Sequence, residues 1–222
     1  MNDYELIRNL AVSIIPLIFA LSFHEAAQAF VAHKLGDRTA YMQGRLTFNP
    51  TKHLDIWGSL VIPIIVYLGS KGTFWFGYAK PIPIDSRNFK NYQRDACLTI
   101  CAGLMANLAM AFMWGAVIVA LYYLKINETF FLYMAAIGIR INLSLFAINL
   151  IPLLPLDGGK IALLFTPYKY THYLINLERY SFFIIMGLSI LGVLTKYWIL
   201  PIMNFFNNII MILIRMCGVF LI

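Results

Sequence analysis

The sequence predicts an all-α polytopic membrane protein with about five or six transmembrane helices. The 222-residue chain is 61% hydrophobic and only 12% charged, whereas about a quarter of the residues of an average soluble domain are charged. Several apolar runs reach the roughly 20 residues that span a bilayer. The formal charge of +7 fits basic cytoplasmic loops. Since no strongly basic run is interleaved with aromatic residues, we expect no nucleic-acid partner.

Five apolar runs define the predicted spans, at residues 8–32, 96–124, 129–151, 178–199 and 201–221. The first run is too long for the core of a signal peptide, so we expect it to remain as a permanent span. We expect residues 1–222 to form a single membrane-embedded domain. Its core would be residues 8–160, and 178–221 would supply additional C-terminal helices.

The region after the first helix has a different character. Residues 33–55 carry four basic against two acidic side chains, and residues 71–95 carry five against two. The apolar segment 56–69 between them is short and contains Pro63. If both flanks are cytoplasmic, this segment must enter and leave on one side as a re-entrant element. A short, tilted sixth span is the alternative.

His24 and Glu25 lie side by side inside the first apolar run. Ionisable side chains are costly in hydrocarbon, so such residues are functional candidates. They begin the pattern H-E-x-x-H, in which two imidazoles one helical turn apart bind Zn²⁺ and the glutamate activates water. Gln28 stands where the second histidine is expected.

A second polar cluster follows the third predicted span. Pro152, Pro155 and a pair of glycines break the helical pattern here, and irregular backbone at membrane depth must be buried in protein or line a wet cavity. Asp157 must therefore be paired, neutralised or bound to a metal, with a helix N-terminal cap as the alternative. Asn149 offers a neutral donor and acceptor for a peptide, although an interhelical hydrogen bond explains it equally well.

The two polar clusters belong to a set of short sequence motifs that follow one another in a specific order over residues 20–160. They include Ser22-Phe23-His24-Glu25, Gly44-Arg45-Leu46-Thr47-Phe48-Asn49-Pro50, Ala79-Lys80-Pro81-Ile82-Pro83, and Asn149 to Gly158. The ordered set resembles the site-2 protease family of intramembrane zinc metalloproteases, peptidase family M50, and is most similar to its compact members without a PDZ domain. The segment Lys80–Pro83 would either guide an extended substrate or form a surface turn.

The resemblance implies a role for each matching residue. His24 and Asp157 would be zinc ligands, with Gln28 at the position of the remaining ligand. Glu25 would be the general base, and Asn149 would engage the substrate or the tetrahedral intermediate.

Two further residues, His53 and Asn107, are candidates for substrate contact or for a supporting role behind the ligands. For the altered motif three routes stay open: Gln28 ligates through its oxygen, His53 replaces it, or zinc binds weakly.

The implied activity is that of a zinc metalloendopeptidase holding one Zn²⁺ per chain. Its substrates would be transmembrane or membrane-tethered proteins. We expect it to be a multi-pass protein of the plasma or inner membrane, with the active site toward the cytoplasm. The alternative is a catalytically impaired pseudoprotease that acts as a membrane scaffold or client-binding protein, because Gln28 replaces a zinc-ligand histidine.

Overall fold

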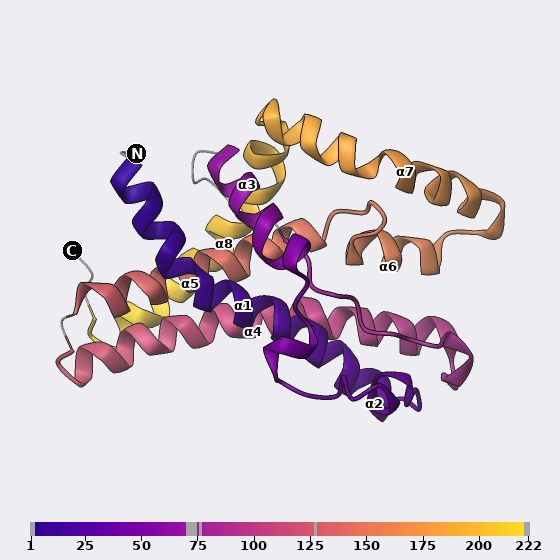
Figure 1. Ribbon diagram of the computed structural model, residues 1–222, viewed down its shortest axis with the longest axis horizontal. Coiled ribbons are helices and arrows are strands. Elements are labelled where there is room, and N and C mark those ends of the chain that lie inside the picture. Colours follow the sequence, from indigo (N-terminus) through magenta and orange to yellow (C-terminus); the bar gives the residue numbers. More distant parts are fainter. Residues whose placement is uncertain (1–2, 70–74, 76, 127, 220–222) are drawn as a thin grey trace.

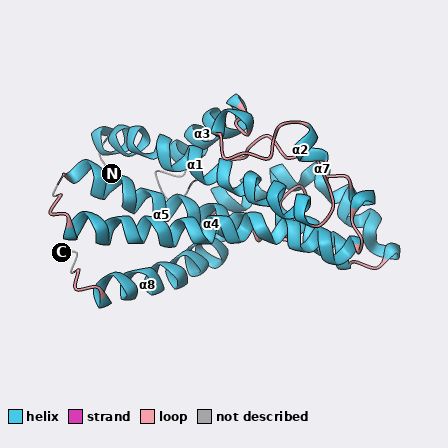
Figure 2. Cartoon of the chain, turned by 90° about the horizontal axis from the view of Figure 1, so that it is seen from below, coloured by secondary structure: helices cyan, strands magenta, loops and turns pink. Residues whose placement is uncertain are grey.

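The computed structural model describes residues 3–69, 75, 77–126 and 128–219, and all regular secondary structure in these ranges is helical (Figures 1 and 2). Four of the described helical stretches are long and apolar enough to cross a membrane, and one shorter apolar helix covers Trp57–Gly69. The long stretches are Ile7–Lys34, Tyr92–Tyr123, Thr129–Asn149 and Thr195–Met216. The prediction of an all-α polytopic membrane protein is confirmed.

Three helices form the centre of the molecule: α1 (Asp3–Lys34), α4 (Tyr92–Tyr123) and α5 (Thr129–Asn149). They run side by side along the long axis of the molecule (Figure 1). In α5 nearly every residue from Ile137 to Ile148 is buried, as expected for a helix that is apolar on all sides and lies inside a bundle. Predicted spans 8–32, 96–124 and 129–151 correspond to these helices.

The short apolar segment after α1 is a single helical piece. A π-helical stretch η2 (Trp57–Val61) of five residues leads into α3 (Ile62–Gly69) of eight residues. At about 1.5 Å per residue, these residues extend about 20 Å, which is short of the roughly 30 Å hydrocarbon core. The helix therefore does not cross a bilayer by itself. Between α1 and η2, the regular structure consists of the short helix α2 (Thr39–Met42) and the 3₁₀ turn η1 (Pro50–Lys52).

The prediction of a span at 178–199 is wrong. Helix α7 (Tyr168–Ile190) ends before Gly192, whose φ of +70° is the left-handed conformation that commonly terminates helices. A π-helical stretch η4 (Thr195–Ile199) then runs directly into α8 (Leu200–Met216). The fourth candidate span thus begins at Thr195, because Pro201 is tolerated near the start of α8 and does not interrupt the helix.

A tight turn between α5 and α6 (Asp157–Phe165) brings the second polar cluster into the bundle. The Leu154–Pro155 peptide bond is cis. The glycines that follow are required by close backbone approach, since a Cβ on Gly159 would lie 2.2 Å from the carbonyl carbon of Leu153. The first residue of α6, Asp157, is consequently directed toward α1.

Candidate functional site

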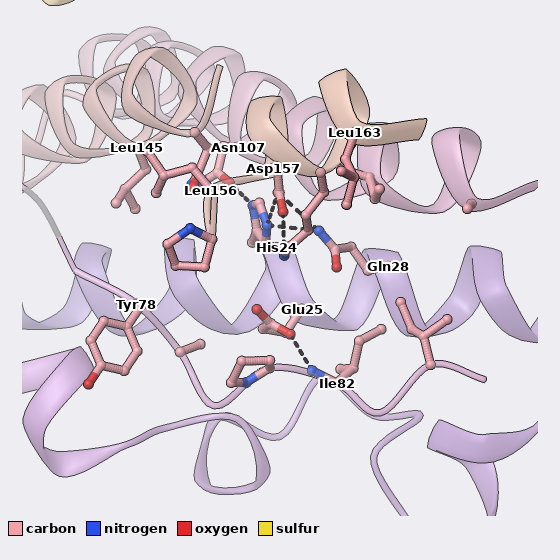
Figure 3. A pocket seen from close by; sticks show the side chains of 18 of the residues that line it. His24, Glu25, Gln28, Tyr78, Ile82, Asn107, Leu145, Leu156, Asp157 and Leu163 are labelled. Atoms are coloured by element: carbon pink, nitrogen blue, oxygen red, sulfur yellow. Dashed lines mark hydrogen bonds and ion pairs between the residues drawn. The ribbon is translucent and has the colours of Figure 1, made fainter. Parts of the chain in front are cut away.

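The polar residues of α1 and α6 meet in one buried cluster (Figure 3). His24 and Gln28 are one helical turn apart and so share a face of α1. The His24 Nε2 atom lies 2.9 Å from Asp157 Oδ2. The Gln28 Nε2 atom lies 3.1 Å from each of these two atoms. All three residues are buried, so residues separated by more than 120 positions form one compact cluster.

The cluster fits closely against helix α4 at Gly103. A Cβ at this position would lie 2.5 Å from His24 Nε2 and 2.6 Å from Gln28 Nε2. Real Cβ atoms do not approach other atoms this closely, so only glycine lets α4 pass the cluster without displacing it.

Asn107, one turn further along α4, orients His24. The Asn107 Oδ1 atom accepts a hydrogen bond from His24 Nδ1, which assigns the imidazole proton to Nδ1 and leaves a lone pair on Nε2. A partner that fixes the tautomer of a histidine in this way is the usual support of a metal-binding imidazole. The predicted supporting role of Asn107 thus has a geometric basis.

The donor set can be tested against the requirements of zinc. Ligand atoms at about 2.0–2.1 Å from a tetrahedral Zn²⁺ lie about 3.3 Å from one another. The separations of 2.9 and 3.1 Å within the cluster are close to this value. His24 Nε2 and Asp157 Oδ2 both offer lone pairs, and two such acceptors in contact need a cation or a proton between them. These two residues fit a zinc site.

Gln28 fits only after one adjustment. Its amide nitrogen, which cannot ligate a metal, faces the other two residues. A half-turn of the amide about its last torsion would present Oε1 instead. Within the described ranges no group of three or more His, Cys, Asp or Glu side chains is arranged to hold a metal ion. In that orientation Gln28 would offer its amide oxygen as a third donor beside His24 and Asp157.

Asp157 is the first residue of α6 and follows the N-cap position, Leu156, and the contacts of its carboxylate are with the side chains of His24, Gln28 and Lys160. Its second oxygen, Oδ1, accepts a hydrogen bond from Lys160 Nζ at 2.9 Å. Lys160 did not emerge from the sequence reasoning. The signal was present, because residues three apart on a helix face one another. The ammonium group stabilises the ionised carboxylate and holds Oδ2 toward His24.

Glu25 faces a different partner. Its Oε2 atom accepts a hydrogen bond of 2.8 Å from the backbone amide of Ile82, and Figure 3 shows the side chain directed toward Ile82 and away from Asp157. Ile82 belongs to residues 77–85, which have no regular secondary structure and which we call the crossing segment because they pass beside α1. The alternative of a surface turn is not what the structure shows: Lys80 and Pro81 are exposed, but no turn is assigned at Lys80–Pro83, and Ile82 is buried and bonded to α1.

A cavity of about 660 Å³ connects these groups. It is bounded by α1, α4, α5, α6 and the crossing segment. The predicted site residues that line it are His24, Glu25, Gln28, Asn107, Asn149 and Asp157, together with Lys160. Most of the remaining lining is apolar, as is usual for a ligand-binding cavity with a few convergent polar groups.

His53 does not line this cavity. It is fully buried, and its Nε2 atom donates to the backbone oxygen of Thr47 at 2.8 Å. Burial lowers the pKa of His53, so the imidazole is neutral near pH 7 and acts as a hydrogen-bond donor. The backbone oxygen of His53 accepts a hydrogen bond of 2.7 Å from the amide of Lys80. The structure therefore gives His53 a part in holding the crossing segment and does not bring it to Gln28.

The fold and the cavity together define a polytopic membrane protein with a cluster of polar and ionisable side chains buried among its helices. The chain is 35% identical over 201 residues to the "Putative zinc metalloprotease YwhC" of Bacillus subtilis (strain 168), covering 86% of this chain and 85% of that protein. The chain belongs to this zinc metalloprotease family. No protein-family model matches the chain, and no solved structure matches it significantly.

Proposed function

We propose that this protein is an intramembrane zinc metalloendopeptidase of the site-2 protease type, peptidase family M50. Its substrates would be transmembrane or membrane-tethered proteins. The observation that carries the proposal is the convergence of His24, Gln28 and Asp157 within 3.1 Å of one another, in a cavity that also contains Glu25. A buried cluster of this kind within apolar helices is expected to be functional.

His24 and Asp157 would hold the zinc, with Gln28 contributing its amide oxygen. When bound, zinc supplies Lewis acidity that polarises a carbonyl group and lowers the pKa of water. Glu25 acts as the general base, since the Ile82 amide holds Oε2 and leaves Oε1 to take up a proton and return it to the leaving amine. Asn149, which lines the cavity, is suited to donate to a substrate carbonyl.

The location of the site fits a peptide bond near the cytoplasmic surface of the plasma or inner membrane. His24 is ten residues from the end of α1 at Lys34, which corresponds to about 15 Å of helix. Residues 33–55 follow directly after this end of α1 and carry four basic against two acidic side chains, and a bias of Lys and Arg marks the cytoplasmic side. The apolar cavity lining suits substrate residues that leave a lipid environment.

The first test is the zinc content of the purified protein in detergent, with His24→Ala and Asp157→Ala as controls. We expect about one zinc per chain, lost in both variants. A second arm measures cleavage of a reconstituted single-span substrate by wild-type protein and by Glu25→Gln. Zinc without cleavage, or cleavage that survives Glu25→Gln, contradicts the proposed mechanism.

One observation favours a second candidate, a pseudoprotease that binds client helices without cleaving them. The Gln28 amide donates to both His24 and Asp157, so the cluster satisfies much of its own hydrogen bonding in the absence of metal. This candidate expects no zinc in the wild-type protein, even after metal loading, together with retained binding of membrane-protein clients by His24→Ala.

A further inference from the structure

The crossing segment is hydrogen-bonded to its neighbours through backbone groups, while the side chains of Ala79 and Ile82 pack into apolar clusters. The Tyr78 amide donates to the oxygen of Gly58 at 2.9 Å, and the Lys80 amide donates to the oxygen of His53 at 2.7 Å. At its other end the Asp85 amide donates to Asp37 Oδ2 at 2.9 Å. The path of this segment is therefore set by groups on other parts of the chain.

Arg45 binds the middle of this segment. Its Nη1 atom donates to the oxygen of Pro81 at 2.6 Å, and its Nη2 atom donates to the oxygen of Lys80. The side chain is 7% exposed. A guanidinium group presents its donors in a rigid planar fork, so two consecutive carbonyls bound by one fork cannot rotate independently. The carbonyl of Pro81 belongs to the same peptide unit as the amide of Ile82.

The prolines on either side of Ile82 limit both the hydrogen-bond donors and the backbone conformations of this stretch. Pro81 and Pro83 have no backbone N–H, so Ile82 supplies the only amide proton of the three residues. Lys80 and Ile82 each precede a proline, which restricts them to extended conformations. The single donor in this stretch is thus rigidly aimed, and its acceptor is Glu25 Oε2 at 2.8 Å.

We propose that Arg45 is a positioning residue for Glu25: by fixing the peptide unit between Pro81 and Ile82, it aims the Ile82 amide that orients the Glu25 carboxylate. Arg45 itself touches neither the His24–Gln28–Asp157 cluster nor the reacting groups. The proposal rests on the proposed function for its effect on cleavage. The effect of Arg45 on the Glu25–Ile82 hydrogen bond can be measured even if the protein cleaves no substrate.

The first arm of the test is hydrogen–deuterium exchange of the full-length protein in detergent micelles. Because Pro81 and Pro83 carry no amide hydrogen, Ile82 is the only exchanging site in that stretch. We expect Arg45→Lys, which keeps the charge but loses the fork, to speed exchange at Ile82 by about tenfold, the effect of losing one charge-assisted hydrogen bond. Glu25→Ala should do the same, and the double variant should be no faster than either single one.

The matched control is Arg87→Lys. Arg87 is exposed and pairs with Asp85 at 2.7 Å near the end of the crossing segment, and it contacts neither carbonyl bound by Arg45. We expect it to leave Ile82 exchange unchanged. Protection across α5 serves as the check on folding, and Arg45→Gln replaces Arg45→Lys if that protection falls. Wild-type protection of Ile82 in the Arg45 variant overturns the proposal.

The second arm measures cleavage of a membrane substrate. We expect Arg45→Lys to lower kcat about tenfold while KM stays within about twofold, because an oriented base acts in the transition state and not in substrate binding. Arg87→Lys should match wild type. Faster Ile82 exchange with an unchanged kcat overturns the positioning role. If wild type cleaves nothing, the proposed function fails, and the exchange arm still decides whether Arg45 controls the Glu25–Ile82 bond.

Discussion

Replacing Gln28 by histidine tests the metal site most directly. The amide of Gln28 already lies 3.1 Å from both His24 Nε2 and Asp157 Oδ2. An imidazole on the same helix position reaches the same region and brings a lone pair without any rotation of an amide. We therefore expect Gln28→His to complete a set of two histidines and one carboxylate, a common type of zinc ligand set.

The magnitude follows from the ligand chemistry. Removing a partner behind a ligand already costs about 10–100-fold in metal affinity, so exchanging a weak amide oxygen for an imidazole in direct contact should gain at least about 100-fold. A factor of 100 corresponds to about 2.7 kcal/mol. The new ring must avoid α4, but it occupies nearly the space of the present amide, which Gly103 accommodates.

Zinc affinity would be measured by competition with a chelator of known affinity, in detergent at constant pH. Gln43→His is the matched control, because Gln43 is exposed beyond α2 and reports adventitious binding by an added histidine. The reasoning is refuted if Gln28→His binds zinc no more tightly than wild type. That result would remove Gln28 from direct contact with the metal.

Three further perturbations address the surroundings of the site. Gly103→Ala should lower zinc affinity at least about tenfold, because the new Cβ would lie 2.5 Å from His24 Nε2; a chelator competition checks this, and unchanged affinity would contradict the packing. Asn107→Ala frees the His24 ring and should lower zinc affinity by about 10–100-fold, with the thermal midpoint of unfolding as the control for packing. Burial acts to raise the pKa of Asp37, but hydrogen bonds from neighbouring side chains and amides outweigh it and hold the pKa below its usual value. The carboxylate thus contributes stability above the unfolded pKa of about 3.9, and this is lost as the pH falls through the lower folded pKa. Asp37→Asn should cost about 1–3 kcal/mol at pH 7 and weaken the fall of the unfolding free energy as the pH drops below about 5; an unchanged pH profile would count against this assignment.

Much of the fold could be predicted because its elements are long and apolar. Helices α1, α4 and α5 follow from runs that exceed the thickness of a bilayer, and their bounds match the predicted spans closely. The C-terminal region could not be divided correctly from hydropathy. Its apolar residues continue on both sides of Gly192, and the break depends on one glycine with φ of +70°. Pro201 suggested a break between two spans, whereas the helix continues through it from η4 into α8.

Some residues of the candidate site could be identified from the sequence, and others could not. His24, Glu25 and Asp157 could be identified because ionisable groups within apolar sequence are rare. Arg45 gave no such signal, since it binds backbone oxygens of Lys80 and Pro81 that every sequence possesses. The position of His53 was equally hidden, because its contacts are with the backbone of Thr47 and Lys80. Interactions with the main chain become visible only once the path of the chain is known.

The network that orients His24 also joins the three central helices. Asn107 on α4 accepts from His24 and donates through Nδ2 to the oxygen of Ala20 on α1 and to Asn142 Oδ1 on α5, both at 3.4 Å. Asn142 in turn donates to the oxygen of Gly138 at 2.9 Å. Where helices lie in hydrocarbon, every buried polar group needs a protein partner, so these amides cannot exchange their bonds for water when the helices shift. The orientation of the imidazole and the packing of α1, α4 and α5 are therefore coupled, and a change that loosens this interface acts on the candidate metal site even when it lies far from Asp157.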